Sequence, residues 1–452
     1  MPKPIGKAQA KLMQIQLRYG KDGLVVEVPD GNLAHLLRLN HLPILEDAPA
    51  ATRQALAEPI DTQPLAELAR DRRDACIVVS DITRPVPNGL LLPPILEALE
   101  SAGLPPERTT VLIATGLHRG NTPEEFAVMG LEAALARGVR VENHEARNRD
   151  HHEYLGQTSL DLPAWVDRRY VEADLRILTG LVEPHLMAGY SGGRKAICPG
   201  LCAVETVLRW HSPQILQAPE ACAGNLRNNQ VHAQALEIAR LAGGADMIVN
   251  VTLDEKRNVT GVFAGELEAA HLAAMEVAER QTKVVLEEPV DIVLTTAAGY
   301  PLDLTFYQGV KGMIGAAPIV KQGGTILIAQ ENAEGIGGPE YTELMLGMTS
   351  PQEYLQRAFR GEVCCIDQWQ VQMQERVLRR AELMQYCTGL DRATLEKLFV
   401  KPVSSVEEGL KEALARHGSQ ARIAVIPEGP YVLACLRDDP VGSRSVREMV
   451  ES

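Results

Sequence analysis

The sequence of 452 residues lacks any apolar run of 18 residues, the length that a membrane-spanning helix requires. Its first residues, MPKPIGKAQAKLMQIQLRYG, also lack the apolar core of a secretory signal. We therefore expect a cytoplasmic protein that does not enter a membrane. Positive charge is scarce, with 45 Lys and Arg against 59 Asp and Glu and a net charge of −14. This balance argues against nucleic acid as a partner, although a few local basic residues can still bind a small anion.

Several familiar cofactor and metal motifs are absent as well. The eight cysteines form no paired C-x-x-C set, and no H-E-x-x-H motif occurs, so no conventional zinc site is expected. A Walker loop and a dinucleotide-binding G-x-G-x-x-G after the first strand are missing too. The usual hydride carriers are therefore not indicated, and we predict reduced, mostly buried thiols.

Short apolar runs alternate with helical patterns along most of the chain, which predicts an α/β fold. The length predicts two domains, and the pattern starts afresh near residues 283–290. We predict domains at 1–285 and 286–452, each with a mainly parallel sheet flanked by helices and with the active site in the cleft between them. The pattern allows the last strand to pack back onto the first domain. The predicted strands include 76–80, 110–116, 174–180, 291–299, 323–330 and 421–429.

Smaller features are also predicted. The first 30 residues form two strands around a KDG turn, and residues 246–265 form a hairpin. Thr122 and Glu125 form a capping box that opens a helix through residue 137.

Polar residues follow four of the predicted strands. Arg84 closes a Ser-Asp-x-Thr-Arg segment, His118 and His185 follow two further strands, and Lys311 lies beyond a fourth. Each segment alone also fits an ordinary turn with a helix cap or a structural histidine. Parallel strands end at the same edge of a sheet, so we expect these residues to face one crevice. The Arg84 guanidinium and Lys311 suit a carboxylate or phosphate. Two histidines that flank such an anion suit acid–base chemistry with mirror-related halves, as in racemisation or epimerisation.

The stretch HLMAGYSGGRKAICPG, residues 185–200, is crowded with glycines and basic residues. Backbone N–H groups of Gly192 and Gly193 can approach an anion, while Arg194 and Lys195 neutralise it. Taken by itself, the stretch predicts a phosphate-binding loop.

In their order along the chain, these motifs resemble the nickel-pincer-dependent lactate racemase family. The motifs are Ser-Asp-x-Thr-Arg-Pro, Gly-x-His-Arg, Glu-Pro-His-x-x-x-Gly-Tyr-Ser-Gly-Gly-Arg-Lys, Trp-His and Tyr-Gln-x-x-Lys, and the resemblance covers about residues 76 to 330. It implies a nickel pincer nucleotide, a pyridinium-3-thioamide-5-thiocarboxylic acid mononucleotide, tethered covalently to Lys195. It also implies that His211 binds the nickel alongside the sulfur and carbon donors of the pincer. Soft sulfur donors together with an imidazole suit Ni(II). Ser80 and Asp81 would support the cofactor and the lysine, and Gly192, Gly193 and Arg194 would bind the phosphate.

The resemblance further implies a racemase or epimerase that inverts C2 of a 2-hydroxy acid by proton-coupled hydride transfer to the pincer. His118 and His185 would be the two acid–base residues, and Ile82 and Leu117 are candidates for tuning the substrate. Cofactor-maturation enzymes would be partners. Residues expected to contact the substrate are Arg84, Tyr307, Gln308, Lys311 and Trp369.

Three alternatives remain open at this point. The same cofactor could serve an epimerase of a sugar or sugar acid. A non-catalytic nucleotide- or cofactor-binding protein would keep Lys195 and His211 without needing both His118 and His185. A hydrolase or phosphotransferase would need a nucleophile–base pair or a carboxylate-rich metal site that the sequence does not indicate. The sequence leaves a monomer and a homodimer equally open.

The remaining histidines and cysteines have plainer interpretations. His144, His151 and His152 lie in a polar stretch that predicts a solvated loop, while His232 and His271 lie in helical patterns as packing or surface residues. Cys198 and Cys202 flank the glycine-rich stretch, but the resemblance assigns the sulfur ligands of nickel to the cofactor.

Overall fold

The computed structural model describes residues 11–439 and 441–451, which divide into two compact units. The first unit comprises Asn40–Gln281 and the end of the chain from Arg444. The second unit comprises the chain up to Leu39 together with Thr282–Ser443. Within the described residues, no helix is long and apolar enough to cross a membrane.

The first unit is built on a six-stranded sheet in the order β13-β12-β9-β4-β5-β6. All neighbouring strands are parallel except β12 and β13, which form the predicted hairpin. The central strands are buried on both faces, as covered parallel sheets require. The strands are β4 (Ala75–Ser80), β5 (Thr109–Ala114), β6 (Arg140–Asn143), β9 (Leu175–Leu181), β12 (Met247–Leu253) and β13 (Val259–Gly265).

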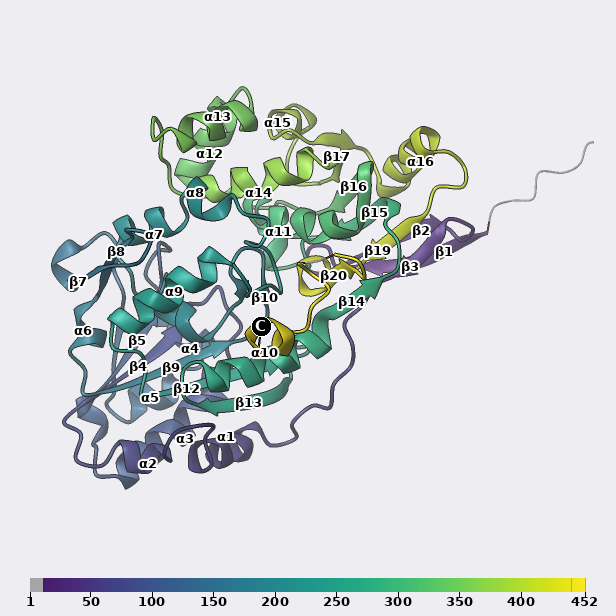
Figure 1. Cartoon of the computed structure of the whole chain (residues 1–452). Helices are drawn as coiled ribbons and strands as arrows, with labels where there is room; N and C mark the ends of the chain where they lie inside the picture. Colours follow the sequence, from purple (N-terminus) through teal and green to yellow (C-terminus); the bar gives the residue numbers. More distant parts are fainter. Residues whose placement is uncertain (1–10, 440, 452) are drawn as a thin grey trace, which may run out of the picture. The chain divides into compact units, whose positions relative to one another are not determined.

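Helices α1, α2 and α3 gather on one side of this sheet (Figure 1) and pack on its alternate apolar residues, such as Ile77, Ile113 and Val249. Short two-stranded ribbons, β7–β8 and β10–β11, lie outside the sheet. The ribbons are β7 (His152–Gln157), β8 (Pro163–Asp167), β10 (Pro184–His185) and β11 (Gly189–Tyr190). The helices are α1 (Ala48–Ala57), α2 (Leu65–Leu68), α3 (Asn88–Ser101), α4 (Pro123–Val128), α5 (Glu132–Ala136), α6 (Arg168–Val171), α7 (Val204–Trp210), α8 (Pro213–Leu216), α9 (Gln230–Leu241), α10 (Ala269–Thr282) and α17 (Val446–Glu451).

The second unit contains another six-stranded sheet, in the order β18-β17-β16-β15-β19-β3, and all its pairs are parallel. The strands are β1 (Leu12–Leu17), β2 (Leu24–Pro29), β3 (Leu33–Leu36), β14 (Lys283–Leu286), β15 (Val290–Thr296), β16 (Val320–Ala329), β17 (Ala381–Tyr386), β18 (Lys401–Val403), β19 (Ile423–Ile426) and β20 (Leu433–Leu436). The helices are α11 (Phe306–Ala316), α12 (Pro339–Gly347), α13 (Pro351–Phe359), α14 (Gln368–Leu378), α15 (Arg392–Lys397) and α16 (Val406–His417).

The predicted α/β architecture with two mainly parallel sheets is confirmed. The compact units nevertheless differ from the predicted ranges 1–285 and 286–452 at both termini. Strand β3 pairs with β19, and Leu17 and Val26 of the β1–β2 ribbon join the second core, so residues 11–39 belong to the second unit. The last strand, β20, pairs with β14 in that same unit. Only the final helix returns to the first unit, where Val446 is buried.

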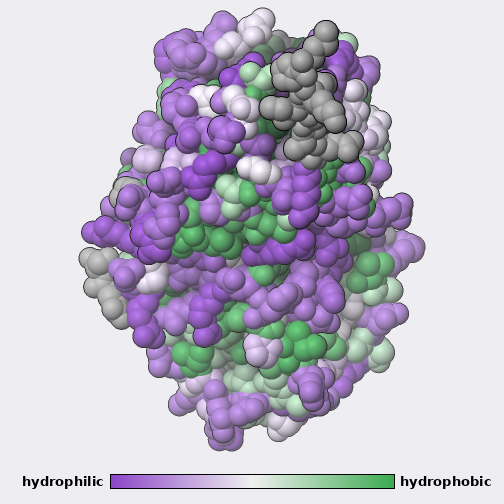
Figure 2. All heavy atoms as spheres, turned by 90° about the vertical axis from the view of Figure 1, so that its right-hand side faces the viewer, coloured by the Kyte–Doolittle hydropathy of each residue, from purple (hydrophilic) through white to green (hydrophobic). Residues whose placement is uncertain are grey.

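The surface agrees with the charged composition. The face drawn in Figure 2 is mostly hydrophilic, with small separated apolar patches. Exposed large apolar side chains such as Val25 and Val128 are individually ordinary on a globular surface.

Candidate active site

Three polar segments of the first unit follow neighbouring parallel strands. Asp81 follows β4, the turn that ends in His118 follows β5, and His185 lies shortly after β9. Strand β4 is central and pairs with both β5 and β9. The sheet therefore brings three of the four predicted segments to the same edge, and a crevice shared by all four stays a prediction.

His118 and Asp81 form a hydrogen-bonded pair. The His118 Nδ1 lies 2.8 Å from Asp81 Oδ2, and the Thr83 hydroxyl donates to Asp81 Oδ1 at 2.8 Å. Burial acts to raise the pKa of Asp81, but His118, Arg84 and Thr83 more than offset it and hold that pKa below its ordinary value. The carboxylate thus accepts the Nδ1 proton, which leaves Nε2 of a neutral His118 as a free proton acceptor.

Arg84 and Ser80 flank this pair. The backbone N–H of Arg84 donates to the Asp81 carbonyl, and its Nη1 donates to the carbonyl and hydroxyl of Thr83. Ser80 is the last residue of β4 and is partly exposed. Arg84 therefore belongs to the same tight turn as Asp81, at the strand end where a substrate anion is expected.

The glycine-rich stretch is a compact loop that only glycine can form at two positions. Gly192 has φ 76°, and a Cβ there would lie 2.7 Å from Asn250 Oδ1. Gly193 has φ 51°, and its Cβ would lie 2.5 Å from His271 Nδ1. The Gly193 N–H donates to Asn250 Oδ1 at 2.9 Å, and His271 Nε2 donates to the Ser191 carbonyl at 2.7 Å. The buried side chains of Asn250 and His271 thus hold the backbone of the loop through hydrogen bonds.

Arg194 is turned into this loop. It is 1% exposed, and its guanidinium donates to the carbonyls of Tyr190 at 3.1 Å and Ala188 at 2.7 Å. Burial lowers the pKa of Arg194 to about 9. These contacts make Arg194 a buried brace of the loop, whereas the sequence had suggested a phosphate contact.

Lys195 lies beside His185. Its Nζ is 3.3 Å from His185 Nε2 and 5.0 Å from the centroid of the Trp210 ring. The other ring nitrogen, Nδ1, accepts the backbone N–H of Ala188 at 3.2 Å. A neutral His185 therefore carries its proton on Nε2, facing the amine.

His211 follows α7 and is 8% exposed. Burial, together with the positive charge of Lys195, lowers its pKa to about 3. Its Nδ1 lies 3.1 Å from the Val207 carbonyl, so Nδ1 carries the proton and Nε2 keeps its lone pair. A neutral imidazole oriented by such a hydrogen bond is the form that binds a metal ion.

Among the described residues, no group of three or more His, Cys, Asp or Glu could hold a metal ion. A metal bound to His211 would therefore need most of its donors from another molecule. That requirement fits a metal that arrives within an organic cofactor.

The second unit places Tyr307, Gln308 and Lys311 together on α11, and Trp369 on α14. The Trp369 Nε1–H donates to the Tyr307 hydroxyl at 2.9 Å, and Gln370 Nε2 donates to the Tyr307 carbonyl at 2.8 Å. The structure thus joins Tyr307 to Trp369 within this unit. That these residues meet the first-unit group in one cleft stays a prediction.

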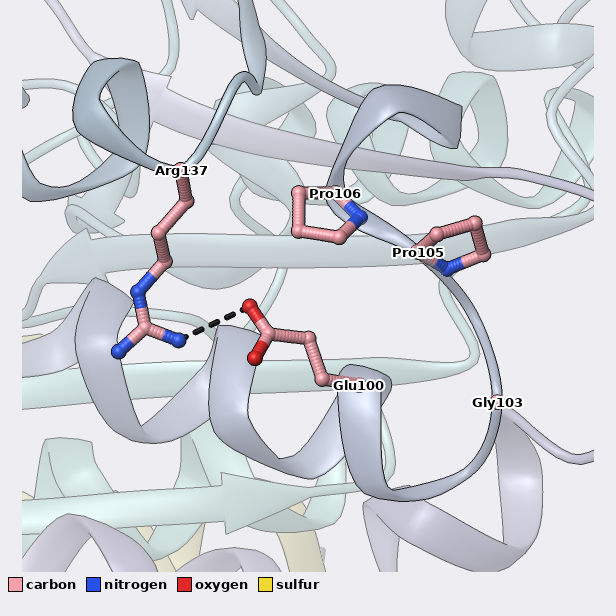
Figure 3. Close-up of a pocket in the computed structure, with 5 residues that line it drawn as sticks. All are labelled: Glu100, Gly103, Pro105, Pro106 and Arg137. Carbon is pink, nitrogen blue, oxygen red and sulfur yellow. Dashed lines mark hydrogen bonds and ion pairs between the residues drawn. The ribbon is translucent and has the colours of Figure 1, made fainter.

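Two surface depressions lie apart from all these residues. One, of about 680 Å³, is lined by Glu100, Gly103, Pro105, Pro106 and Arg137. Figure 3 shows the Glu100–Arg137 ion pair across it, with a length of 2.9 Å. Another, of about 510 Å³, lies along α12 and α13 and includes Glu343 and Tyr354. No predicted site residue lines either depression. The candidate site is therefore defined by the contacts of its side chains and not by a surface depression.

Sequence reasoning missed four buried polar residues near the site. His144 and His152 are 1% and 2% exposed, so the prediction that they lie in a solvated loop is wrong. His151 does lie at the surface, beside Glu145. Asn250 and His271 hold the glycine loop. The one available signal was Asn250, a polar residue in the apolar strand pattern of β12, because a buried amide needs a partner.

Two mainly parallel sheets, with histidines, a carboxylate and a lysine after the strand ends of the first unit, place the chain in the class of α/β enzymes. Models of the lactate racemase N-terminal and C-terminal domains match residues 19–224 and 285–434. The chain is 33% identical to the lactate racemase of Thermoanaerobacterium thermosaccharolyticum, over 93% of its own length and 99% of that protein. It is 32% identical to the lactate racemase of Lactiplantibacillus plantarum, over 93% of this chain and 100% of that protein. The chain belongs to the lactate racemase family.

Solved structures agree with this assignment. The lactate racemase apoprotein from T. thermosaccharolyticum superposes with a TM-score of 0.86 at 32% identity, covering 93% of this chain and 100% of that one. A protein from Thermotoga maritima shares the fold with a TM-score of 0.64 at 16% identity, covering 86% and 98% of the two chains. The family relationship supports an isomerase of the racemase class.

Proposed function

We propose that this protein inverts C2 of a 2-hydroxy acid, with lactate as the first substrate to test. The observation that carries the proposal is the pair of strand-end imidazoles, each held by a defined partner. His118 is fixed by Asp81, and His185 lies against Lys195. Lactate racemases that are 32% and 33% identical over 93% of the chain make lactate the leading choice.

Racemisation needs a base for each enantiomer, because the hydroxyl proton of each mirror image must be removed and returned. The free Nε2 of His118 can accept such a proton, while Asp81 stabilises the imidazolium that results. His185 would serve the opposite enantiomer through its Nε2, once the Lys195 amine no longer faces it and the ring proton has moved to Nδ1, which must then release the Ala188 N–H. The assignment of one histidine to each enantiomer explains why one site would hold two histidines.

The charged residues support a substrate with a carboxylate. Arg84 can present a planar fork of N–H donors, and Lys311 a compact positive charge. Gln308 lies beside Lys311 on α11, and the linked pair Tyr307 and Trp369 adds an aromatic wall. We propose that these residues together bind the carboxylate and body of the substrate.

We further propose that the site takes a nickel pincer nucleotide. Lys195 would hold it covalently, His211 would bind the nickel, and Ser80 with the N–H groups of the Gly192–Gly193 loop would contact the nucleotide. When bound, this group would supply the acceptor for the C2 hydride. The neutral, oriented imidazole of His211 and the lysine facing His185 fit these tasks. Arg194 would act indirectly, by bracing the loop.

The test is co-expression with cofactor-maturation enzymes, followed by intact mass, nickel content and a racemisation assay. We expect added mass at Lys195, about one nickel per chain, and interconversion of L- and D-lactate. The variant Lys195→Ala should fold normally and carry neither the added mass nor the nickel. A fully loaded protein that turns over a sugar or sugar acid but no 2-hydroxy acid would change the assigned substrate to that sugar or sugar acid. A bare chain beside a relative that loads in the same cells would overturn the cofactor proposal.

A further inference from the structure

A buried chain of polar side chains lies directly behind the turn that carries His118. The hydroxyl of Thr115 is 3.2 Å from His144 Nδ1, and His144 Nε2 is 3.0 Å from His152 Nε2. At the far end, His152 Nδ1 is 2.9 Å from the Asn148 carbonyl. Neither imidazole reaches solvent, and the chemistry derived above uses neither.

The partners at the far end determine where each proton lies. A carbonyl only accepts, so His152 must donate from Nδ1 and offer a bare Nε2. His144 then donates from Nε2, and its Nδ1 is left as a second acceptor for the Thr115 hydroxyl, which also donates to the His144 carbonyl at 2.9 Å. With the hydroxyl proton shared between that carbonyl and Nδ1 in a three-centre bond, this set of tautomers leaves both rings neutral. Burial also lowers the pKa of His144 to about 3, which keeps the ring neutral in its site.

The chain of bonds is attached to the His118 turn through Thr115. The Thr115 carbonyl accepts the backbone N–H of His118 at 2.9 Å, which closes the turn. The next residue, Gly116, donates its N–H to the Gly200 carbonyl at 3.0 Å, in the segment after Lys195. Backbone bonds also fix His144 to the end of β5, through the Ile113 carbonyl. The histidine pair thus anchors the turn at the residue that closes it.

Packing alone does not explain two histidines here. The rings meet edge to face, with centroids 5.2 Å apart and an interplanar angle of 88°, an arrangement that apolar rings could also fill. Burying imidazoles is unfavourable unless each polar atom finds a partner. What the imidazoles add to an apolar pair is a directional bond to Thr115.

We propose that His144 and His152 are positioning residues that act on His118 through the Thr115 hydroxyl. They hold the turn so that His118 Nδ1 faces Asp81 and Nε2 faces the substrate. The effect on turnover rests on the proposed function of His118, whereas the effect on the His118 ring does not.

The test compares Thr115→Val, His144→Phe and the double variant. Thr115→Val is nearly isosteric, so it keeps the test available even if His144→Phe fails to fold. The matched control is Thr109→Val, at the start of β5, the strand that Thr115 follows, where a buried hydroxyl has no hydrogen-bond partner. The first readout is the imidazole nitrogen NMR shifts of His118 in the cofactor-free protein labelled with 15N-histidine. The second is kcat and KM for lactate in the loaded enzyme.

In the wild type we expect His118 to show one neutral tautomer, protonated on Nδ1. Both single variants should shift His118 towards a mixture of tautomers and lower kcat about tenfold, with KM changed less than about threefold. The double variant should be no worse than Thr115→Val, because that variant already removes the bond to the His144 ring as well as the bond to the His144 carbonyl. Thr109→Val should match the wild type.

Unchanged His118 nitrogen shifts in Thr115→Val and His144→Phe would overturn the positioning proposal, as would additive losses in the double variant. If the loaded wild type fails to racemise any 2-hydroxy acid, the proposed function fails instead. The nitrogen shifts of the cofactor-free protein would still decide the positioning proposal in that case.

Discussion

His118 can act as a base only through a nitrogen that carries no proton, and Asp81 determines which nitrogen that is. The Asp81 carboxylate accepts from Nδ1 at 2.8 Å and is 5% exposed. In Asp81→Asn the amide can donate to Nδ1 instead, which moves the ring proton to Nε2 and blocks the base. We expect kcat for lactate to fall about 100-fold in both directions.

Racemisation rates of the loaded Asp81→Asn protein check this prediction, with nickel content measured to separate catalysis from loading. Asp150→Asn, at an exposed carboxylate, is the control and should behave as the wild type. An Asp81→Asn protein that loads fully and turns over normally would show that His118 needs no fixed tautomer.

The glycine loop offers a second residue-scale prediction. Gly193→Ala places a Cβ 2.5 Å from His271 Nδ1 at φ 51°, so it adds a clash to the cost of left-handed backbone. Gly244→Ala has φ 66° but open space around its Cβ, so it carries the backbone cost alone. We expect the free energy of unfolding to fall by about 2–5 kcal/mol for Gly193→Ala and about 1–2 kcal/mol for Gly244→Ala.

Urea unfolding measures both values, and intact mass shows whether Gly193→Ala still takes up the cofactor proposed for Lys195. Equal losses in the two variants would mean that the loop shifts away from His271 at little cost.

At the scale of elements, the strands could be predicted because short apolar runs flanked by polar residues are typical of buried parallel strands. The helix predicted from Thr122 through residue 137 illustrates where such reading fails. Its capping box is present, but α4 ends at Val128, Gly130 follows with φ 74°, and the chain becomes helical again only in α5. Gly130 packs on Gly89 of α3, a contact distant in sequence that no local pattern reveals.

The candidate site was likewise predictable only in part. Motif order pointed to His118, His185, Lys195 and His211, which the structure gathers in the first unit. The orientation of Arg194 and the burial of His144 could not be predicted, because both depend on carbonyls and side chains brought close only by folding. Local composition made these residues look solvated.

Helix α9 provides a prediction about an element that supports the site. Its N-cap, Asn229, accepts the N–H of Val231 and donates to the carbonyls of Met187 and Asn225. The side chain therefore links the start of α9 to the segment after His185. Because it is buried, Asn229→Ala should lower the free energy of unfolding by about 2–3 kcal/mol.

A more exposed cap serves as the control. Ser405 accepts the Glu408 N–H at the start of α16, and Ser405→Ala should lower the free energy of unfolding by about 1 kcal/mol. Both values come from urea unfolding. A loss in Asn229→Ala no larger than that in Ser405→Ala would show that the link to Met187 contributes little.

At the scale of the whole molecule, buried neutral histidines make stability depend on pH. Burial lowers the pKa of His144 and His271 to about 3 and that of His232 to about 2, from an ordinary value of 6.5. Between about pH 6.5 and pH 3 the unfolded chain binds protons at these positions and the folded chain does not. The free energy of unfolding therefore falls as the pH drops below 6.5, and this contribution stops changing near pH 3.

The size of the effect at pH 5 depends almost only on the unfolded value, since pH 5 lies well above the folded pKa values. Each histidine should remove about 2 kcal/mol between about pH 7.5 and pH 5. Urea unfolding at several pH values measures the total, and His232→Gln should reduce the pH dependence by about one histidine's share. His41→Gln, at an exposed histidine, should leave the pH dependence unchanged. If His232→Gln keeps the full pH dependence of the wild type, the folded protein must admit a proton at His232 without opening, and the acid sensitivity must arise from other groups.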